Sequence, residues 1–170
     1  MKSYETSQAR LRIRQIGYTG KMPDGIAGSC PKLPGEPDLP IDAGDGGCPD
    51  EPRCRQGHPW TRQIHTIAID ERCDYISDSG EEIWRLLETR GIRNVMIVGV
   101  HANMCVLGRP FGLRQQVRTG RNVVLIRDLT DTMYNPKRPP NVSHFRGTDL
   151  LVNHVERYVC PTITSDQLVR

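Results

Sequence analysis

Two short apolar runs on either side of one helical pattern constrain the fold of this chain most strongly. Residues 95–100 (VMIVGV) and 122–126 (NVVLI) are hydrophobic almost throughout, a pattern typical of strands that are buried on both faces. The segment between them, 105–120 (CVLGRPFGLRQQVRTG), has helical character despite Pro110. A strand, a helix and a second strand over this length predict a βαβ unit, in which the two strands are parallel.

Similar elements flank this unit. Ser79 followed by Glu82 is a capping-box signature at the start of an amphipathic segment, and Gly91 provides its C-terminal stop. The further elements that we expect are a strand at 63–69 (QIHTIAI), helices at 79–90 and 148–158, and a short closing strand at 162–165.

This alternation of strands and helices predicts the fold class. We expect an α/β fold with a three-layer, open parallel sheet and helices on both faces, as in Rossmann-like proteins. The strands at 63–69, 95–100 and 122–126 should lie parallel in one sheet.

The N-terminal third has a different composition. Segment 17–61 holds most of the turn-forming residues and shows no apolar periodicity, which is typical of a long loop or a covering arm. We therefore divide the chain into a Pro/Gly-rich arm or insertion at 1–62 and an α/β domain at 63–170.

Charge and hydropathy exclude two classes of partner. The net charge is +3 and the arginines are scattered, which argues against a nucleic-acid-binding module. No run approaches the roughly 18 apolar residues of a membrane span, and the N-terminus lacks the apolar core of a signal peptide. We expect a cytoplasmic protein with no nucleic-acid or membrane partner.

The chain has six cysteines, and without a signal peptide we expect free thiols. A zinc site is the alternative, because Cys30, Cys48, Cys54 and His58 all lie in the loop-rich arm. However, the chain has no C-x-x-C pair, and the spacings are poor for zinc. We therefore predict no metal and no cofactor.

Cys105 has the most informative position. It lies just beyond a predicted parallel strand, at the start of a predicted helix, where open α/β sheets present their chemistry. Unpaired backbone N–H groups at a helix N-terminus lower a thiol pKa and can hold an oxyanion. The alternative is a packing role, since cysteine is among the most often buried residue types.

The segments around Cys105 resemble a known superfamily. The stretches GIRNVMIVGVHANMCVLG (91–108), RTGRNVVLIRDL (118–129) and HVERYVCPTITSDQL (154–168) are similar to the isochorismatase-like cysteine hydrolases, which include the nicotinamidases. The resemblance implies that Cys105 is the nucleophile and that the backbone N–H groups of His101 and Cys105 form the oxyanion hole. It also implies a cis peptide bond before His101.

Two members of the family triad of Asp, Lys and Cys have no counterpart here. The family Asp lies on a first strand, but the early segment 11–17 (LRIRQIG) contains no Asp. The family Lys would lie near the end of the 63–69 strand, where the cation present is Arg72, and arginine does not release its proton. Ala102 also stands where the family often has Thr. We therefore expect an N-terminally incomplete member that lacks the first strand and helix.

Two functional hypotheses follow from these observations. The first is a cysteine-dependent hydrolase that cleaves a small amide or related C–N substrate through a covalent Cys105 intermediate. The second is a truncated, catalytically silent member of the family that acts in binding or assembly. An incomplete sheet exposes an apolar flank, so we also expect a homo-oligomer.

A few further side chains are weaker candidates. Asp128 and Asp131 follow a strand end and could line the site or cap a loop. His144 could face the site or anchor the loop before the last helix. The metal set of nicotinamidases is not reproduced by His58 and His65, and packing roles are expected for Trp60 and Trp84.

Overall fold

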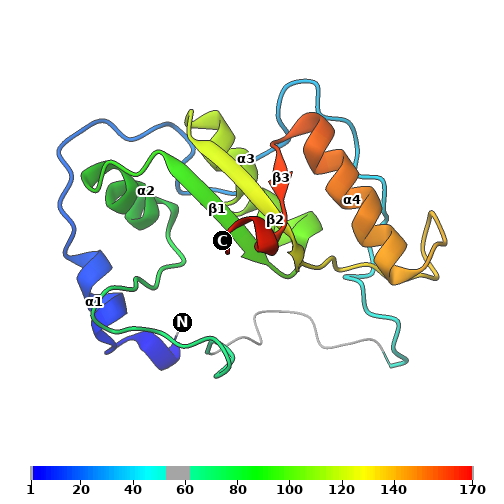
Figure 1. The fold of residues 1–170 in the computed structure, drawn as a ribbon, viewed down its shortest axis with the longest axis horizontal. Helices are drawn as coiled ribbons and strands as arrows, with labels where there is room; N and C mark the ends of the chain where they lie inside the picture. Colours follow the sequence, from blue (N-terminus) through cyan, green and yellow to red (C-terminus); the bar gives the residue numbers. More distant parts are fainter. Residues whose placement is uncertain (1, 53–61, 170) are drawn as a thin grey trace.

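The structure is a computed structural model, and it describes residues 2–52 and 62–169. The described chain forms short helices and a small sheet, with one longer helix near the C-terminus (Figure 1). In chain order the elements are η1 (Lys2–Tyr4), α1 (Gln8–Arg14), α2 (Gly80–Thr89), β1 (Asn94–Gly99), η2 (Ala102–Val106), α3 (Leu113–Arg118), β2 (Asn122–Thr130), α4 (His144–Tyr158), β3 (Thr162–Ile163) and η3 (Ser165–Gln167).

The sheet has the order β1-β2-β3, and both neighbouring pairs are parallel. In the first pair Val95 lies opposite Val123 and Ile97 opposite Leu125. This confirms an α/β fold with an open parallel sheet, and it confirms the parallel pairing of the two apolar runs. The predicted closing strand is present as β3.

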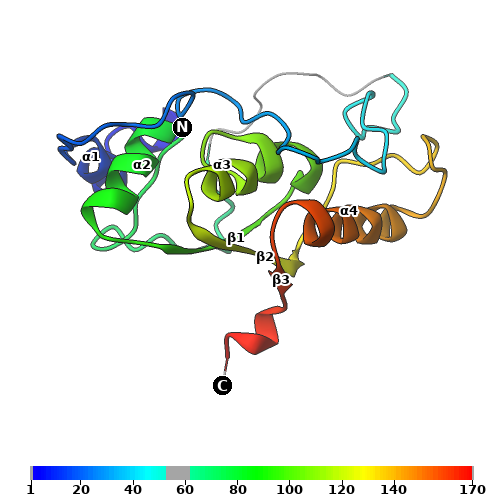
Figure 2. The same cartoon turned by 90° about the horizontal axis from the view of Figure 1, so that it is seen from above.

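The core lies on one face of this sheet. Figure 2 shows α3 and α4 on the same side of the three strands. On the other face, Met96 and Val98 of β1 are 58% and 50% exposed. Helices on both faces are therefore not confirmed. The buried core cluster joins β2 to both helices and includes Val123, Leu125, Leu113, Leu151 and Val155.

The predicted strand at 63–69 is wrong. These residues form turns and irregular structure, and Ile64 and Ile67 are exposed. The Ile67 N–H donates to the Ile64 carbonyl within a turn, and the Gln63 N–H donates to the Tyr4 hydroxyl. Alternation specifies a strand only where one face can be buried against a neighbour, and these apolar side chains are not buried.

The single helix predicted for 105–120 is interrupted. The chain forms η2, a π-helical turn, and a second helix, α3, begins only at Leu113. Pro110 lies in the break, where its missing N–H and its ring prevent a continuous helix. The Arg109 N–H and Gly112 N–H close turns onto Cys105 and Arg109 carbonyls on either side of the proline.

The N-terminal cap of α2 agrees with the sequence prediction, whereas that of α4 differs from it. Ser79 accepts a hydrogen bond from the Glu82 N–H at the start of α2, as predicted. The Glu82 carboxylate does not complete a capping box but pairs with Arg10 of α1. Helix α4 begins at His144, four residues before the predicted start at residue 148, because Ser143 caps it.

A buried ion-pair cluster anchors the described part of the arm to the core. Glu36 has no exposed side-chain surface and accepts hydrogen bonds from Arg114 of α3 and His154 of α4. The Leu33 N–H donates to the same carboxylate. The arm therefore contacts both helices that cover the sheet. None of the described helices is long and apolar enough to cross a membrane.

The expectation of free thiols is wrong at Cys48, which is disulfide-bonded. That expectation rested on the compartment, which sets the ambient redox potential but does not fix the state of an individual loop cysteine. The alternative zinc site includes Cys54 and His58, which lie outside the described residues. The free cysteines of the described chain are Cys30, Cys73, Cys105 and Cys160.

Candidate functional site

The site forms where β1 ends. His101 follows this strand in a left-handed conformation, with φ 60° and ψ 46°, and then η2 begins. The Val106 N–H donates to the His101 carbonyl and closes the turn. A left-handed non-glycine residue costs about 1–2 kcal/mol, so the surrounding contacts must hold this bend. The bend turns the chain sharply from the strand into η2.

Cys105 is half-buried on this turn, one turn beyond His101. The cis peptides of the described chain precede Pro52 and Pro140. The expected cis bond before His101 is therefore wrong, and the left-handed conformation of His101 makes the bend instead.

Asp131 lies against the same turn. Its carbonyl accepts a hydrogen bond of 2.8 Å from the Ala102 N–H. Its carboxylate oxygen Oδ1 accepts three more, from the Thr132 N–H at 2.8 Å, His144 Nε2 at 2.8 Å and the Thr148 hydroxyl at 3.2 Å. The structure thus brings Asp131 and His144, both weaker candidates in the sequence, together beside the Cys105 turn.

Both ring nitrogens of His144 face acceptors. Nδ1 lies 2.9 Å from the Tyr134 carbonyl and Nε2 lies 2.8 Å from Asp131 Oδ1. A carbonyl and a carboxylate both only accept, so each nitrogen must carry a proton. His144 is therefore an imidazolium that pairs with the Asp131 carboxylate.

The pKa directions agree with this pairing. The hydrogen bond to the Tyr134 carbonyl raises the pKa of His144; burial opposes it, and Asp131 adds to the rise. Burial alone would raise the pKa of Asp131, but hydrogen bonds from His144 and Thr132 outweigh it and lower the pKa. At His101, burial lowers the pKa and the Asp131 charge partly offsets this. His101 is consequently a neutral imidazole at neutral pH.

Other candidates lie elsewhere or have structural roles. Asp128 accepts hydrogen bonds from the Ser165 N–H and hydroxyl, so it caps the C-terminal 3₁₀ turn. Arg72 pairs with Asp70 inside its own loop, with its side chain 90% exposed. The Trp84 ring packs under the Arg121 guanidinium. Trp60 lies outside the described residues.

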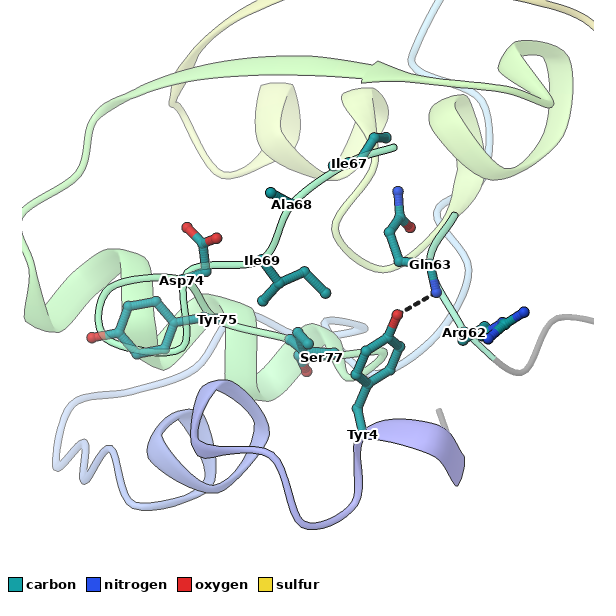
Figure 3. A pocket seen from close by; sticks show the side chains of 10 residues that line it. Tyr4, Arg62, Gln63, Ile67, Ala68, Ile69, Asp74, Tyr75 and Ser77 are labelled. Carbon is teal, nitrogen blue, oxygen red and sulfur yellow. Dashed lines mark hydrogen bonds between the residues drawn. The ribbon is translucent and has the colours of Figure 1, made fainter. Parts of the chain in front are cut away.

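A cavity of about 470 Å³ lies apart from this turn, between η1 and the irregular segment after residue 61. Figure 3 shows the Tyr4 side chain reaching toward Gln63, with the segment 67–69 forming part of the wall. The cavity wall includes neither His101 nor Cys105 and carries no convergent set of reactive groups. The residues that line it are Tyr4, Arg62, Gln63, Ile67, Ala68, Ile69, Asp74, Tyr75, Ile76 and Ser77.

Within residues 2–52 and 62–169, no group of three or more His, Cys, Asp or Glu side chains could hold a metal ion. In comparisons with known proteins, no protein-family model, no curated protein and no solved structure matches this chain. The resemblance to the isochorismatase-like hydrolases therefore stays a prediction from the sequence.

Proposed function

We propose that this chain is an isochorismatase-like cysteine hydrolase that cleaves a small amide through a covalent Cys105 intermediate. One observation carries the proposal: Cys105 lies half-buried on a tight turn directly after the end of a parallel strand. Parallel α/β sheets bind and transform small molecules at this edge. The proposal includes the three-layer arrangement, with helices on both faces of the sheet, that the sequence resemblance implies.

The chemistry follows from the groups on the turn. The Cys105 thiolate attacks the amide carbonyl carbon, and the backbone N–H groups of His101 and Cys105 stabilise the oxyanion that forms. Collapse of the tetrahedral intermediate expels the amine and leaves a thioester on Cys105. Water then hydrolyses the thioester and regenerates the thiol, so that one amide and one water give one acid and one amine.

Selective alkylation tests the nucleophile, with Cys73 as an internal reference. Cys73 is exposed, but partial desolvation by its own loop and the negative charge of the nearby Asp70 carboxylate raise its pKa. We expect limiting iodoacetamide to label half-buried Cys105 faster than exposed Cys73 at a pH well below ~8.5, the pKa of a free thiol. Peptide mass mapping measures the labelling of each cysteine. Labelling of Cys105 no faster than Cys73 would refute its role as the nucleophile.

Hydrolysis of a panel of small primary amides tests the reaction. We expect slow release of ammonia that Cys105→Ala abolishes, whereas the matched variant Cys73→Ala retains wild-type activity. A residual rate in Cys105→Ala equal to that of the wild type would exclude the covalent route.

The open face of the sheet favours a second function, in assembly. Met96, Val98 and Val100 are 58%, 50% and 63% exposed, and β1 pairs only with β2 among the described residues. Exposed apolar sheet surfaces favour association with another chain. A homo-oligomer without amidase activity would fit the catalytically silent hypothesis, and light scattering over a range of protein concentrations measures it directly.

A further inference from the structure

We propose that His144 is a pH-controlled clamp: its protonated ring holds the segment 131–134 closed against η2, and loss of the ring proton releases this segment. The clamp is a conformational device in the loop between β2 and α4. It does not depend on the chemistry of Cys105, so it goes beyond the proposed function and can be tested apart from it.

Hydrogen bonds fix the segment 131–134 to η2. The Ala102 N–H donates to the Asp131 carbonyl at 2.8 Å. The Asn103 side chain makes two more bonds: its Nδ2 donates to the Met133 carbonyl at 3.0 Å, and its Oδ1 accepts from the Met133 N–H at 2.8 Å. Both Ala102 and Asn103 are buried. A displacement of the segment therefore also frees η2.

The His144 ring bridges the two ends of the same segment. Its Nε2 lies 2.8 Å from Asp131 Oδ1, and its Nδ1 lies 2.9 Å from the Tyr134 carbonyl. The Ser143 side chain accepts a hydrogen bond from the Arg146 N–H and caps α4, which fixes the backbone that carries the ring. The helix thus holds the ring, and the ring holds the segment.

Only the charged ring can make both bonds. An imidazolium has two N–H donors, whereas a neutral imidazole has one donor and one lone pair. After loss of the proton, that lone pair faces either the Asp131 carboxylate or the Tyr134 carbonyl, and two acceptors repel each other. One end of the segment is therefore released, whichever tautomer forms.

The release falls in a range of pH that the protein can meet. Histidine is the side chain whose ordinary pKa, about 6.5, lies between pH 5 and 8. The Tyr134 carbonyl and the Asp131 carboxylate raise the pKa of His144 against the effect of burial. The clamp is consequently closed below the ordinary pKa and opens as the pH rises through the raised one.

The surrounding charges differ from His144 in their titration. They are Asp131, His101 and the two ion pairs Arg138–Asp42 and Arg146–Asp149. Burial would raise the pKa of Asp131, but the hydrogen bond from His144 outweighs it and the pKa is lowered. Burial lowers the pKa of His101. The two histidines therefore titrate in separate ranges, and His144 titrates at the higher pH.

Amide hydrogen exchange measured by NMR between about pH 5.5 and 8.5 tests the clamp. The amides of Ala102, Thr132 and Met133 report on it, because each bonds to Asp131 or to Asn103. The Leu125 amide of β2, which bonds to the Pro161 carbonyl, is the reference. Protection is compared after correction for the intrinsic pH dependence of exchange, and the His144 ring signal gives its pKa in the same samples.

We expect the protection of the three reporter amides to fall about fivefold as the pH rises through the pKa of His144, while Leu125 stays protected. His144→Gln, which keeps one neutral donor, should show the lower protection at every pH. His65→Gln removes an exposed histidine outside the clamp and is the matched control. It should keep the wild-type transition.

Reporter amides whose protection stays constant through the pKa of His144 would overturn the clamp, and so would a transition that persists in His144→Gln. If His144→Gln does not fold, Asp131→Asn serves in its place. Loss of the carboxylate charge should move the transition to lower pH, and an unchanged midpoint would count against the clamp. Failure of the clamp leaves the alkylation test of Cys105 unaffected, and equal labelling of Cys105 and Cys73 leaves the clamp unaffected.

Discussion

A single buried carboxylate, that of Glu36, joins the arm to both helices that cover the sheet. Burial would raise the pKa of Glu36, but hydrogen bonds from Arg114, the Leu33 N–H and His154 outweigh it and lower the pKa to about 2. The pair with Arg114 is bidentate, with two guanidinium nitrogens on one carboxylate. Such a buried pair adds little net stability over an apolar replacement, but removing one partner leaves the other charge uncompensated.

Glu36→Gln should therefore destabilise the protein strongly. Loss of the buried negative charge leaves Arg114 unpaired, and we expect the free energy of unfolding to fall by about 3–5 kcal/mol, as measured by urea denaturation. The control is Asp38→Asn, which breaks the exposed pair with Lys32 and should leave the free energy of unfolding almost unchanged, because solvent screens an exposed ion pair. Equal effects of the two substitutions would mean that the cluster does not anchor the arm.

The same residue sets a prediction for acid stability. The folded-state pKa of Glu36 is lowered, so its contribution is present above the unfolded pKa of about 4.3 and is lost as the pH falls toward about 2. Wild-type protein should thus lose stability steeply over this window. In Glu36→Gln the melting temperature should depend less on pH there, and parallel curves for the two proteins would contradict the assignment.

At the candidate site, the stabilising contribution of His144 is lost at high pH, and that of Asp131 is lost at low pH. The pKa of His144 is raised, so its contribution is present below about pH 6.5 and is lost as the pH rises through the folded pKa. The pKa of Asp131 is lowered in the folded state, so its contribution is lost only as the pH falls through this lowered pKa. His144→Ala should therefore lower the melting temperature near pH 6 and have a much smaller effect near pH 9.

The sequence locates part of this site and not the rest. Cys105 and His101 follow an apolar run, so their place at a strand end can be read from the pattern. The pairing of Asp131 with His144 cannot be read this way. It depends on the path of the loop between β2 and α4, which presents the Tyr134 carbonyl to the His144 ring, and no periodic pattern specifies a loop path.

At the scale of elements, agreement with the sequence follows burial. The two apolar runs pair as predicted because both contribute to one core against α3 and α4. The segment 63–69 has the alternation of a strand but lacks a surface to bury it. At 105–120 the apolar pattern is helical, but Pro110 prevents the backbone from following it. Local patterns are thus reliable where tertiary packing supports them.

Helix α4 gives a sharp test of this packing, at Gly147. A Cβ atom on this residue would lie 2.3 Å from Cδ1 of Tyr134, whose side chain is buried. Glycine within a helix ordinarily costs roughly 0.5–1 kcal/mol relative to alanine. Here the steric clash should outweigh that gain, so that Gly147→Ala destabilises the protein by about 1–3 kcal/mol. Asp149→Ala, at an exposed position of the same helix, is the matched control for thermal melting.

At the scale of the whole molecule, α3 and α4 lie on one side of the sheet and the C-terminal turn η3 lies on the other, where Met96 and Val98 of β1 are exposed (Figure 2). The outer strand β1 carries no charge between Asn94 and Gly99. Natural sheet edges commonly use charged residues, proline or bulges to prevent pairing with another chain. Of these, β1 has a register shift between Ile97 and Gly99 but no charge or proline. An uncharged outer strand with an apolar open face therefore predicts association through this side of the sheet.

A single lysine on the open face tests this association. Val98 is 50% exposed on β1, so Val98→Lys adds a charge without removing a core side chain. We expect the wild-type protein to increase in mass with concentration in light scattering and Val98→Lys to shift toward the monomer with little change in melting temperature, since burying an unpaired ammonium at an interface is costly. Phe145→Lys is the control, because Phe145 is an exposed apolar residue on α4, 81% exposed and away from the open face. It should leave the mass unchanged. A wild-type protein that stays monomeric at every concentration, or equal effects of both lysines, would show that the open face of β1 does not mediate assembly.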